Sequence, residues 1–137
     1  MSTMMNHTLM RRLSLAIAVI TIVSGMTQLV WPSRVLTFMA AEVTATSQHF
    51  FAIVGMFMVL FGALLWQGAR AQSSQPAAIF WAGIQKFGAV LAVGLGVMNG
   101  IFSPLATLVA GFDLLSGIII IAYWRGVLCR LKSGMPQ

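Results

Sequence analysis

The amino-acid sequence predicts an all-α integral membrane protein: a bundle of four antiparallel transmembrane helices forming a single domain over residues 1–137. Three observations predict it. Hydrophobic residues make up 59% of the chain, only 7% of residues are charged, and four apolar runs each approach the length of a membrane span. A soluble domain carries about 25% charged residues, so this chain has too few to cover a water-facing surface. Lipid is therefore the expected solvent of the bundle.

The four apolar runs set the expected helices. Crossing about 30 Å of hydrocarbon takes about 20 helical residues. The expected helices cover residues 12–31, 48–69, 77–102 and 105–125, and Trp or Tyr residues near their ends match the aromatic belt at headgroup level. A cleaved signal peptide is the less favoured interpretation of the first run, because its length of about 18 residues exceeds the usual apolar region of such a signal.

The connections between these runs predict how the helices follow one another. Pro76 ends a polar turn and is placed to open the third helix. Residues 33–43 carry their apolar side chains near one helical face, which predicts a short helix in the outer interface. Thr46 or Ser47 is then placed to cap the second long helix. The turn between the third and fourth helices is very short, so these two helices should be antiparallel neighbours.

The basic residues predict the orientation. If both termini are cytoplasmic, the inner side holds six of them: Arg11, Arg12, Arg70, Arg125, Arg130 and Lys132. The outer side then holds only Arg34. This asymmetry follows the positive-inside rule, and the expected location is a bacterial inner (plasma) membrane. The net charge of +6 does not indicate nucleic acid, because no basic groove with interleaved aromatic residues is present.

Several classes of chemistry are excluded or disfavoured by residue type. Cys129 is the only cysteine, so the chain can form neither an internal disulfide nor a CxxC redox pair. Only His49 lies near an expected helix, since His7 is in the polar N-terminal stretch, and this disfavours a haem held by two imidazoles. No glycine-rich loop followed by Lys-Ser or Lys-Thr is present for a nucleotide. We expect no cofactor, no metal site and no catalytic residues.

Asp113 is the exception to this pattern, because it is an acid inside the fourth apolar run. A charged side chain at the centre of a membrane helix costs about 2.5–3.5 kcal/mol on insertion scales. Two interpretations fit. The carboxyl group could bind a proton or a ligand, as intramembrane acids commonly do. Alternatively, it is buried for packing, either protonated or bonded to a neighbouring helix.

Lys86, on the third helix, is the obvious partner for Asp113, since opposite charges relieve each other's desolvation. Counted from Trp81 and Trp124, however, Lys86 lies about 8 Å and Asp113 about 17 Å from the inner boundary. Side chains also lean toward the N-terminus of their own helix, which points these two apart. If the third helix enters at Ala77, the depth difference falls to about 3 Å. The alternatives are an intramembrane ion pair and a Lys86 side chain that extends to the inner headgroups.

The outward lean of Asp113 favours a different site. Gln28, His49, Asn99 and Glu42 each place a polar group in the outer half of the bundle. The resulting hypothesis is a small polar vestibule with Asp113 at its floor. The alternative is that these residues are ordinary interfacial side chains in contact with water or headgroups.

Small residues predict the helix contacts. Ala92, Gly96 and Gly100 repeat at i+4 on the third helix, and Gly55 and Gly62 repeat at i+7 on the second. In lipid, helices associate through close backbone approach and dispersion rather than through a hydrophobic drive. These residues are expected to form packing seams within the bundle. The Ala92–Gly100 face could instead contact a second copy or a larger membrane complex.

The sequence also resembles the DoxX-like small four-helix membrane proteins. The residues that carry the resemblance are Arg12, Gly25 and Pro32 around the first helix, and Gly55 and Gly62 on the second. The resemblance implies a four-helix bundle over residues 11–125. It does not extend to the quinone-linked activity of some members, because the acid that many of them carry on the second helix is missing, with Met56 in its neighbourhood.

These observations favour a non-enzymatic small membrane protein, either an accessory subunit of a larger complex or a bundle that binds a lipid or small molecule. The alternative is a small proton-coupled transporter in which Asp113 and Lys86 titrate. A third possibility, carried by the resemblance alone, is a quinone-associated redox protein.

Overall fold

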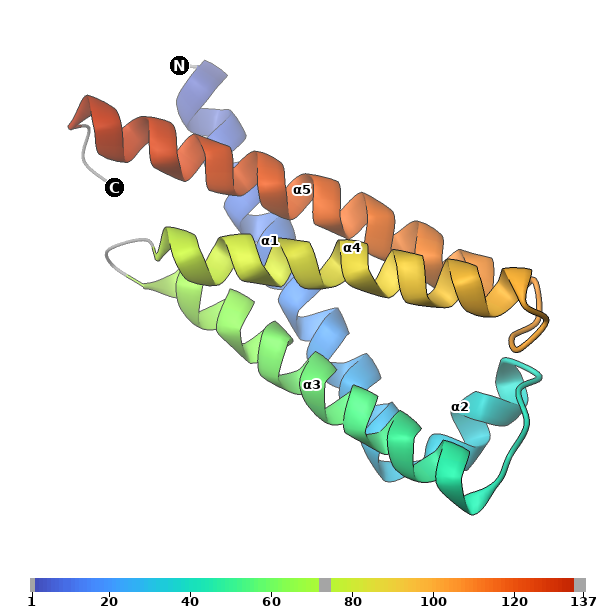
Figure 1. Ribbon diagram of the computed structural model, residues 1–137. Coiled ribbons are helices and arrows are strands. Elements are labelled where there is room, and N and C mark those ends of the chain that lie inside the picture. Colours follow the sequence, from blue (N-terminus) through green and yellow to red (C-terminus); the bar gives the residue numbers. More distant parts are fainter. Residues whose placement is uncertain (1, 72–74, 135–137) are drawn as a thin grey trace.

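The structure of the chain is a computed structural model that describes residues 2–71 and 75–134. Regular structure in these residues is entirely helical, in five helices (Figure 1): α1 Ser2–Val30, α2 Pro32–Phe38, α3 Ala45–Arg70, α4 Pro76–Met98 and α5 Ala106–Ser133. The four long helices are each long and apolar enough to cross a membrane. The all-α class and the four membrane-span helices predicted from the sequence are thus confirmed.

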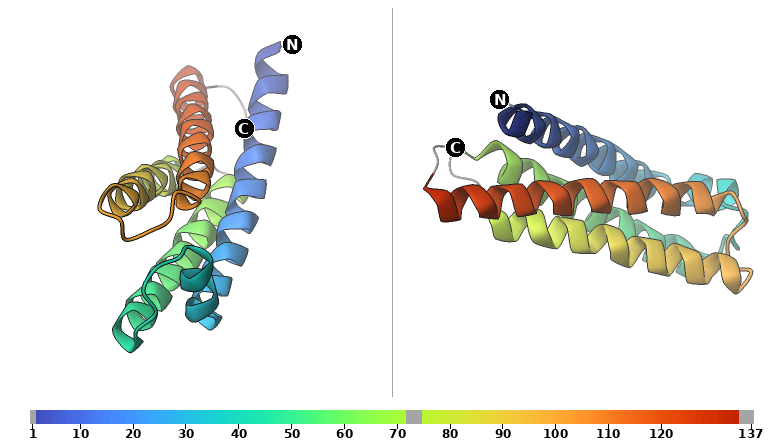
Figure 2. Two further views of the ribbon diagram at one scale, coloured as in Figure 1. Left: turned by 90° about the vertical axis from the view of Figure 1, so that its right-hand side faces the viewer. Right: turned by 90° about the horizontal axis from the view of Figure 1, so that it is seen from above.

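The long helices associate as two pairs. α1 packs along α3, and α4 packs along α5, while contacts between the two pairs are fewer. Figure 1 shows the start of α1, the end of α3, the start of α4 and the end of α5 at one end of the molecule, with α2 and the α4–α5 turn at the opposite end. The views in Figure 2 show that the two pairs diverge toward the end that carries α2.

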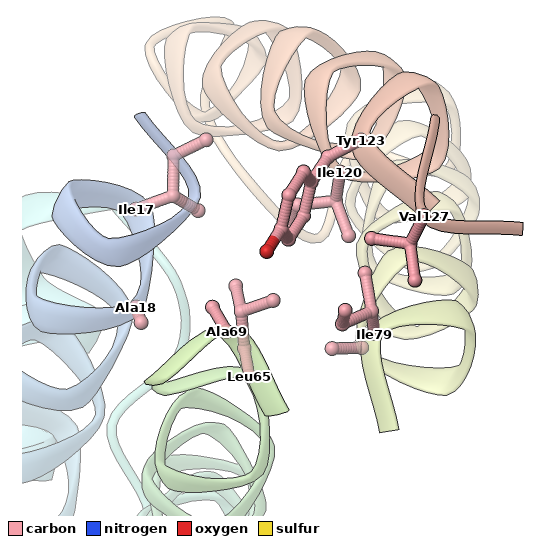
Figure 3. Close-up of a cluster of buried hydrophobic side chains, with 9 residues drawn as sticks. Ile17, Ala18, Leu65, Ala69, Ile79, Ile120, Tyr123 and Val127 are labelled. Carbon is pink, nitrogen blue, oxygen red and sulfur yellow. The ribbon is translucent and has the colours of Figure 1, made fainter. Parts of the chain in front are cut away.

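The hydrophobic core lies where all four long helices meet (Figure 3). It consists of Ile17, Ala18, Leu65, Ala69, Ile79, Ala82, Ile120, Tyr123 and Val127. Its α3 members lie in the C-terminal part of that helix, its α4 members in the N-terminal part and its α5 members in the C-terminal half, so the core is displaced toward the end where α3 ends and α4 begins. Many large apolar side chains elsewhere on the four helices are exposed, which is the surface that lipid requires.

Local sequence explains where several helices begin. α2 and α4 each start with a proline in the first turn, where the missing N–H has no intrahelical partner to lose. α3 starts with a capping box: the Thr44 hydroxyl accepts from the Ser47 N–H at 3.0 Å, and the Ser47 hydroxyl accepts from the Thr44 N–H at 2.8 Å. The cap is therefore Thr44, two residues earlier than the predicted Thr46, and Ser47 completes it.

The helix ends differ from the hydropathy-based bounds. α1 begins at Ser2 rather than near residue 12, and α5 continues to Ser133 rather than ending near residue 125. Hydropathy marks only the stretch that lipid can hold, whereas the helix continues into polar residues as long as its backbone hydrogen bonds do. α4 ends at Met98 instead of 102, ahead of Gly100, whose φ of +70° closes the turn.

The helix predicted at 33–43 is shorter, ending at Phe38. Ala40 has a φ of 50°, a left-handed conformation that stops the helix. Leu36 and Met39 are buried, so this segment packs on the bundle with one side. The Met39 carbonyl accepts the Ser103 N–H at 2.9 Å, which joins the α2 segment to the α4–α5 turn.

Glycines allow α1 and α3 to approach closely. A Cβ at Gly55 would lie 2.6 Å from the Gly25 carbonyl oxygen, and a Cβ at Gly25 would lie 2.6 Å from the Gly55 carbonyl oxygen. A Cβ at Gly62 would lie 2.7 Å from Ile22 of α1. Backbone therefore meets backbone at this seam, as expected for helices held together in lipid by dispersion.

The seam predicted at Ala92, Gly96 and Gly100 is not a continuous helix face. A Cβ at Gly96 would overlap the Phe102 ring, which folds back from the α4–α5 turn. Gly100 lies beyond the end of α4, where it supplies the left-handed turn conformation. The i+4 spacing reflects a turn that packs on its own helix, and Ala92 alone is left exposed on the face.

Candidate functional site: a buried ion pair between α4 and α5

The most unusual polar feature of the bundle is a direct contact between Lys86 of α4 and Asp113 of α5. The Lys86 Nζ donates to the Asp113 Oδ1 at 2.7 Å. The two side chains are only 3% and 7% exposed. Short charge-assisted hydrogen bonds of this kind are about twice as strong as neutral ones. Of the two alternatives for Lys86, the structure has the pair rather than an extended side chain at the headgroups.

Helical periodicity puts both residues on the facing sides of α4 and α5. On α4, Lys86 follows Ala82 and Gly83 on the buried side. On α5, Asp113 shares its buried side with Ser116 and Gly117, three and four positions later. The pair thus lies on the α4–α5 interface, next to the apolar core but farther from the termini.

Gly117 makes room for the lysine stem. A Cβ at Gly117 would lie 3.3 Å from the Lys86 Cβ and 3.1 Å from the Phe87 ring. The root of the Lys86 side chain is therefore level with Gly117, whereas its ammonium group reaches Asp113, one turn of α5 earlier. One turn is about 5.4 Å, which the four-carbon stem of lysine can span.

This path explains why the depth argument from the sequence disfavoured the pair. The argument measured depth from Trp81, but α4 starts at Pro76, more than one turn earlier. It also assumed that Lys86 leans toward the N-terminus of α4. Instead, the side chain passes Gly117 and extends toward the opposite end of α4, and so meets Asp113.

The surroundings of the ammonium group add a second favourable contact. The Lys86 Nζ lies 5.4 Å from the centre of the Phe112 ring, which is within the range of a cation–π interaction. The two charges thus compensate each other inside the protein, and the aromatic face adds to this for the ammonium group. Such a pair can fix the register of two helices.

The other residues of the predicted vestibule are placed differently. Asn99 is exposed, and its Nδ2 donates to the Leu95 carbonyl of its own helix at 2.8 Å. His49 is exposed near the start of α3, with its ring against Phe50 at a centroid distance of 6.1 Å. Each side chain thus contacts a residue close to it in the sequence.

Gln28 and Glu42 also have contacts with residues other than the ion pair. The Gln28 Cβ lies on the α1–α3 seam, 2.8 Å from where a Cβ at Gly55 would be. Glu42 is exposed between α2 and α3, and its carbonyl accepts the Ser47 hydroxyl at 2.8 Å. Within residues 2–71 and 75–134, the ion pair or hydrogen bond of Asp113 is with Lys86 and not with any of these four residues.

Sequence reasoning missed two buried polar residues on α1. Ser14 and Thr21 are 0% and 2% exposed, and their hydroxyl oxygens have no hydrogen-bond partner among the described residues. Gln28 Oε1 is likewise buried without a partner there. The three residues are spaced seven apart on one helix, and this spacing within an apolar run is the signal that could have identified the row.

The described residues contain no metal centre, and no family is assigned to the chain. Within the described residues, no group of three or more His, Cys, Asp or Glu side chains could hold a metal ion. Comparisons with protein-family models, with curated proteins and with solved structures give no match. The resemblance to DoxX-like proteins therefore stays a prediction from the sequence.

Proposed function

We propose that this chain is a non-enzymatic integral membrane protein that acts as a small accessory subunit of a larger membrane complex or as a bundle that binds a lipid or small molecule. The observation that carries the proposal is the buried Lys86–Asp113 contact. These two residues are the only charged side chains in the middle of the apolar runs. Each neutralises the other, so the pair acts as a lock between α4 and α5.

A lock between α4 and α5 is favoured over a path for protons, because such a path needs further titratable or polar groups. Moving a proton across a membrane requires a series of titratable or polar groups that reach both sides. Beyond the pair, the buried polar groups described on α1 and α5 are the hydroxyls of Ser14, Thr21, Ser116 and Tyr123 and the amide oxygen of Gln28, and no further acid or lysine is among them.

The test of the accessory or binding role is purification of the affinity-tagged full chain in mild detergent. A protein partner in stoichiometric amount, or a co-purifying lipid or small molecule identified by mass spectrometry of the extract, is the expected result. A chain that purifies alone and carries nothing from the membrane contradicts the proposal. Asp113→Asn, purified in parallel, distinguishes a structural lock from a binding group: it should lower yield without changing what co-purifies.

The proposed topology is four antiparallel spans with both termini in the cytoplasm of a bacterium, in its inner membrane. The six basic residues at one end and the one at the other support it. Cys129 is the only cysteine of the chain and is exposed. A membrane-impermeant maleimide should therefore label it only after the cells are permeabilised. Thr46→Cys in a Cys129→Ser background is the matched probe for the opposite side and should react in intact cells.

A second candidate, a proton-coupled transporter, is favoured by one observation. The only acid in the apolar runs is buried and bonded to an amine, and intramembrane acids commonly carry protons. Its test is proton flux into liposomes that contain the protein and a pH-sensitive dye, driven by a potassium diffusion potential. Flux above that of empty liposomes and its loss in Asp113→Asn would establish this candidate over the lock. The lock predicts no such flux in either protein.

A further inference from the structure

The charge of the molecule is concentrated at one end. Six of the eight basic residues lie on the parts of α1, α3 and α5 nearest the termini and the α3–α4 connection (Figure 1): Arg11, Arg12, Arg70, Arg125, Arg130 and Lys132. We call this set the basic end. The two remaining basic residues are matched by the two acids, because Lys86 pairs with Asp113 and Arg34 shares the opposite end with Glu42. The whole net charge of +6 therefore resides at the basic end.

Several of these arginines are held in place rather than free in solvent. Arg11 Nε donates to the Ala69 carbonyl of α3 at 2.8 Å, across a separation of 58 residues. The Arg70 guanidinium lies 5.2 Å from the centre of the Trp66 ring. Contacts of this kind reduce the freedom that an arginine side chain would lose on binding a ligand.

Arg130 is anchored to α1. Its Nη1 lies 3.5 Å from the His7 Nδ1, and the His7 ring packs against Tyr123 at a centroid distance of 5.3 Å. His7 and Arg11 are four residues apart on α1, so they share one helix face. Arg130 of α5 contacts His7, and Arg11 lies one turn of α1 from His7, so one arginine from each helix lies near this imidazole where α1 meets α5.

Among residues 2–71 and 75–134, no acidic side chain bonds to either of these two arginines. The chain has only two acidic side chains, and both lie elsewhere. We propose that the basic end binds the phosphate of an anionic phospholipid headgroup, with Arg11 and Arg130 as its ligands at the α1–α5 contact. Guanidinium groups match phosphate oxygens with two parallel hydrogen bonds, and an added anion relieves the repulsion between the two arginines.

A lipid headgroup fits this place better than a soluble phosphate because of where the arginines lie. Arg11 immediately precedes the first apolar run, so its guanidinium falls at the depth of the headgroups when α1 spans the membrane. Basic groups between membrane helices on the cytoplasmic side are known to hold such headgroups. The inference rests on the proposed membrane topology, but it does not depend on whether the chain is an accessory subunit or a transporter.

The experiment is native mass spectrometry of the full chain in a neutral detergent, titrated with phosphatidylglycerol or with phosphatidylcholine of the same acyl chains. We expect phosphatidylglycerol to bind at concentrations at least tenfold lower. Arg11→Gln and Arg130→Gln should each weaken it by about fivefold, the effect of losing one arginine at a membrane surface. The maleimide test at Cys129 reports the topology separately, so a wrong orientation and a missing lipid site give different results.

Two matched controls separate a site from general charge. Arg12→Gln removes a charge from the same end at an exposed position next to Arg11. Arg34→Gln removes one from the opposite end. Both should keep phosphatidylglycerol affinity within about twofold of the parent chain. Because Arg11 also bonds to Ala69, the melting temperature of each variant is recorded, and Arg130→Gln carries the test if Arg11→Gln fails to fold.

Three results would overturn the proposal. Equal binding of the two lipids would show that no anionic headgroup is selected. An equal loss in Arg12→Gln and Arg130→Gln would show attraction by net charge without a site. Displacement of the lipid by millimolar inorganic phosphate, with the same dependence on Arg130, would assign the site to a soluble phosphate.

Discussion

The two helix pairs of this bundle are joined by contacts of different kinds. α1 and α3 touch through backbone, with Gly25 and Gly55 so close that a Cβ on either would lie 2.6 Å from the other's carbonyl oxygen. α4 and α5 are joined by a charge contact, Lys86 to Asp113, at 2.7 Å. The first interface contains no ionisable group at its closest approach, whereas the second contains the two charged residues of the apolar runs.

The comparison indicates which kind of helix contact contributes stability in lipid and which contributes specificity. Close glycine packing gains many weak dispersion contacts and depends on shape alone. A buried ion pair adds little net stability relative to apolar residues of the same size, but it penalises any arrangement that separates the charges. We therefore expect the α1–α3 interface to fail when volume is added and the α4–α5 interface to fail when one charge is removed.

The largest effect is expected from Asp113→Leu, which leaves the Lys86 ammonium without its partner. The free energy of unfolding should fall by about 3 kcal/mol, because an uncompensated charge remains in an apolar interface. The measurement is unfolding of the purified protein by sodium dodecyl sulfate, followed by circular dichroism.

The double variant Lys86→Met with Asp113→Leu is the matched control for this prediction. It removes both charges and should recover most of the lost stability, to within about 1 kcal/mol of the parent chain. A double variant as unstable as Asp113→Leu alone would mean that the pair contributes through its size and packing, and the contrast between the two interfaces would be lost.

The next effect is expected from Gly55→Ala at the α1–α3 seam. The added methyl would lie 2.6 Å and 2.7 Å from backbone atoms of Gly25 and Leu29, which cannot move aside as a side chain can. A loss of about 2 kcal/mol is expected in the same unfolding assay. Gly88→Ala is the control, because nothing lies within 4 Å of a Cβ there. Comparable losses in both variants would argue against the seam.

The smallest effect is expected from Gly117→Ala, which tests whether the lysine stem needs the space left by the missing side chain of Gly117. The methyl would meet the Lys86 Cβ at 3.3 Å and the tip of the Phe87 ring at 3.1 Å, and both can shift slightly. The expected loss is about 1 kcal/mol. Gly111→Ala, on the same helix with open space around it, should change the free energy of unfolding by less than about 0.5 kcal/mol. Equal losses in both variants would mean that alanine destabilises α5 itself and that the contact with Lys86 is not the cause.

The helices were predictable because lipid imposes their length and composition. A run that must satisfy its backbone hydrogen bonds internally and bury no charge leaves a strong signal over about 20 residues. The helix ends carry no such signal. The first turns of α1 and the last turns of α5 are polar, and whether they stay helical depends on contacts such as Arg11 with Ala69 and Arg130 with His7.

The ion pair was only partly predictable. Two opposite charges in neighbouring apolar runs identify the partners, because neither has another partner of comparable depth. Their contact depends on a third residue, Gly117, whose missing side chain lets Lys86 extend against its usual direction. Nothing in the spacing of the charges reveals that path.

The outer vestibule stays a prediction, and the contacts of its other residues show what the sequence leaves open. Depth along a helix places residues at one level but not on one face. Asn99 satisfies its amide on its own helix, and Gln28 lies on the α1–α3 seam. The rotation of each helix decides which residues meet, and for α1 and α3 the close glycine contacts bear on that rotation.

The Lys86–Asp113 contact has a consequence for how the chain enters the membrane. Ribosomes deliver α4 before α5, and α4 has the lowest mean hydropathy of the four spans. Until Asp113 emerges, Lys86 has no acidic group to neutralise it in lipid. We therefore expect α4 and α5, which are joined by a short turn, to enter the bilayer together. The carboxylate of Asp113 on α5 supplies the charge that lets α4, with Lys86, remain there.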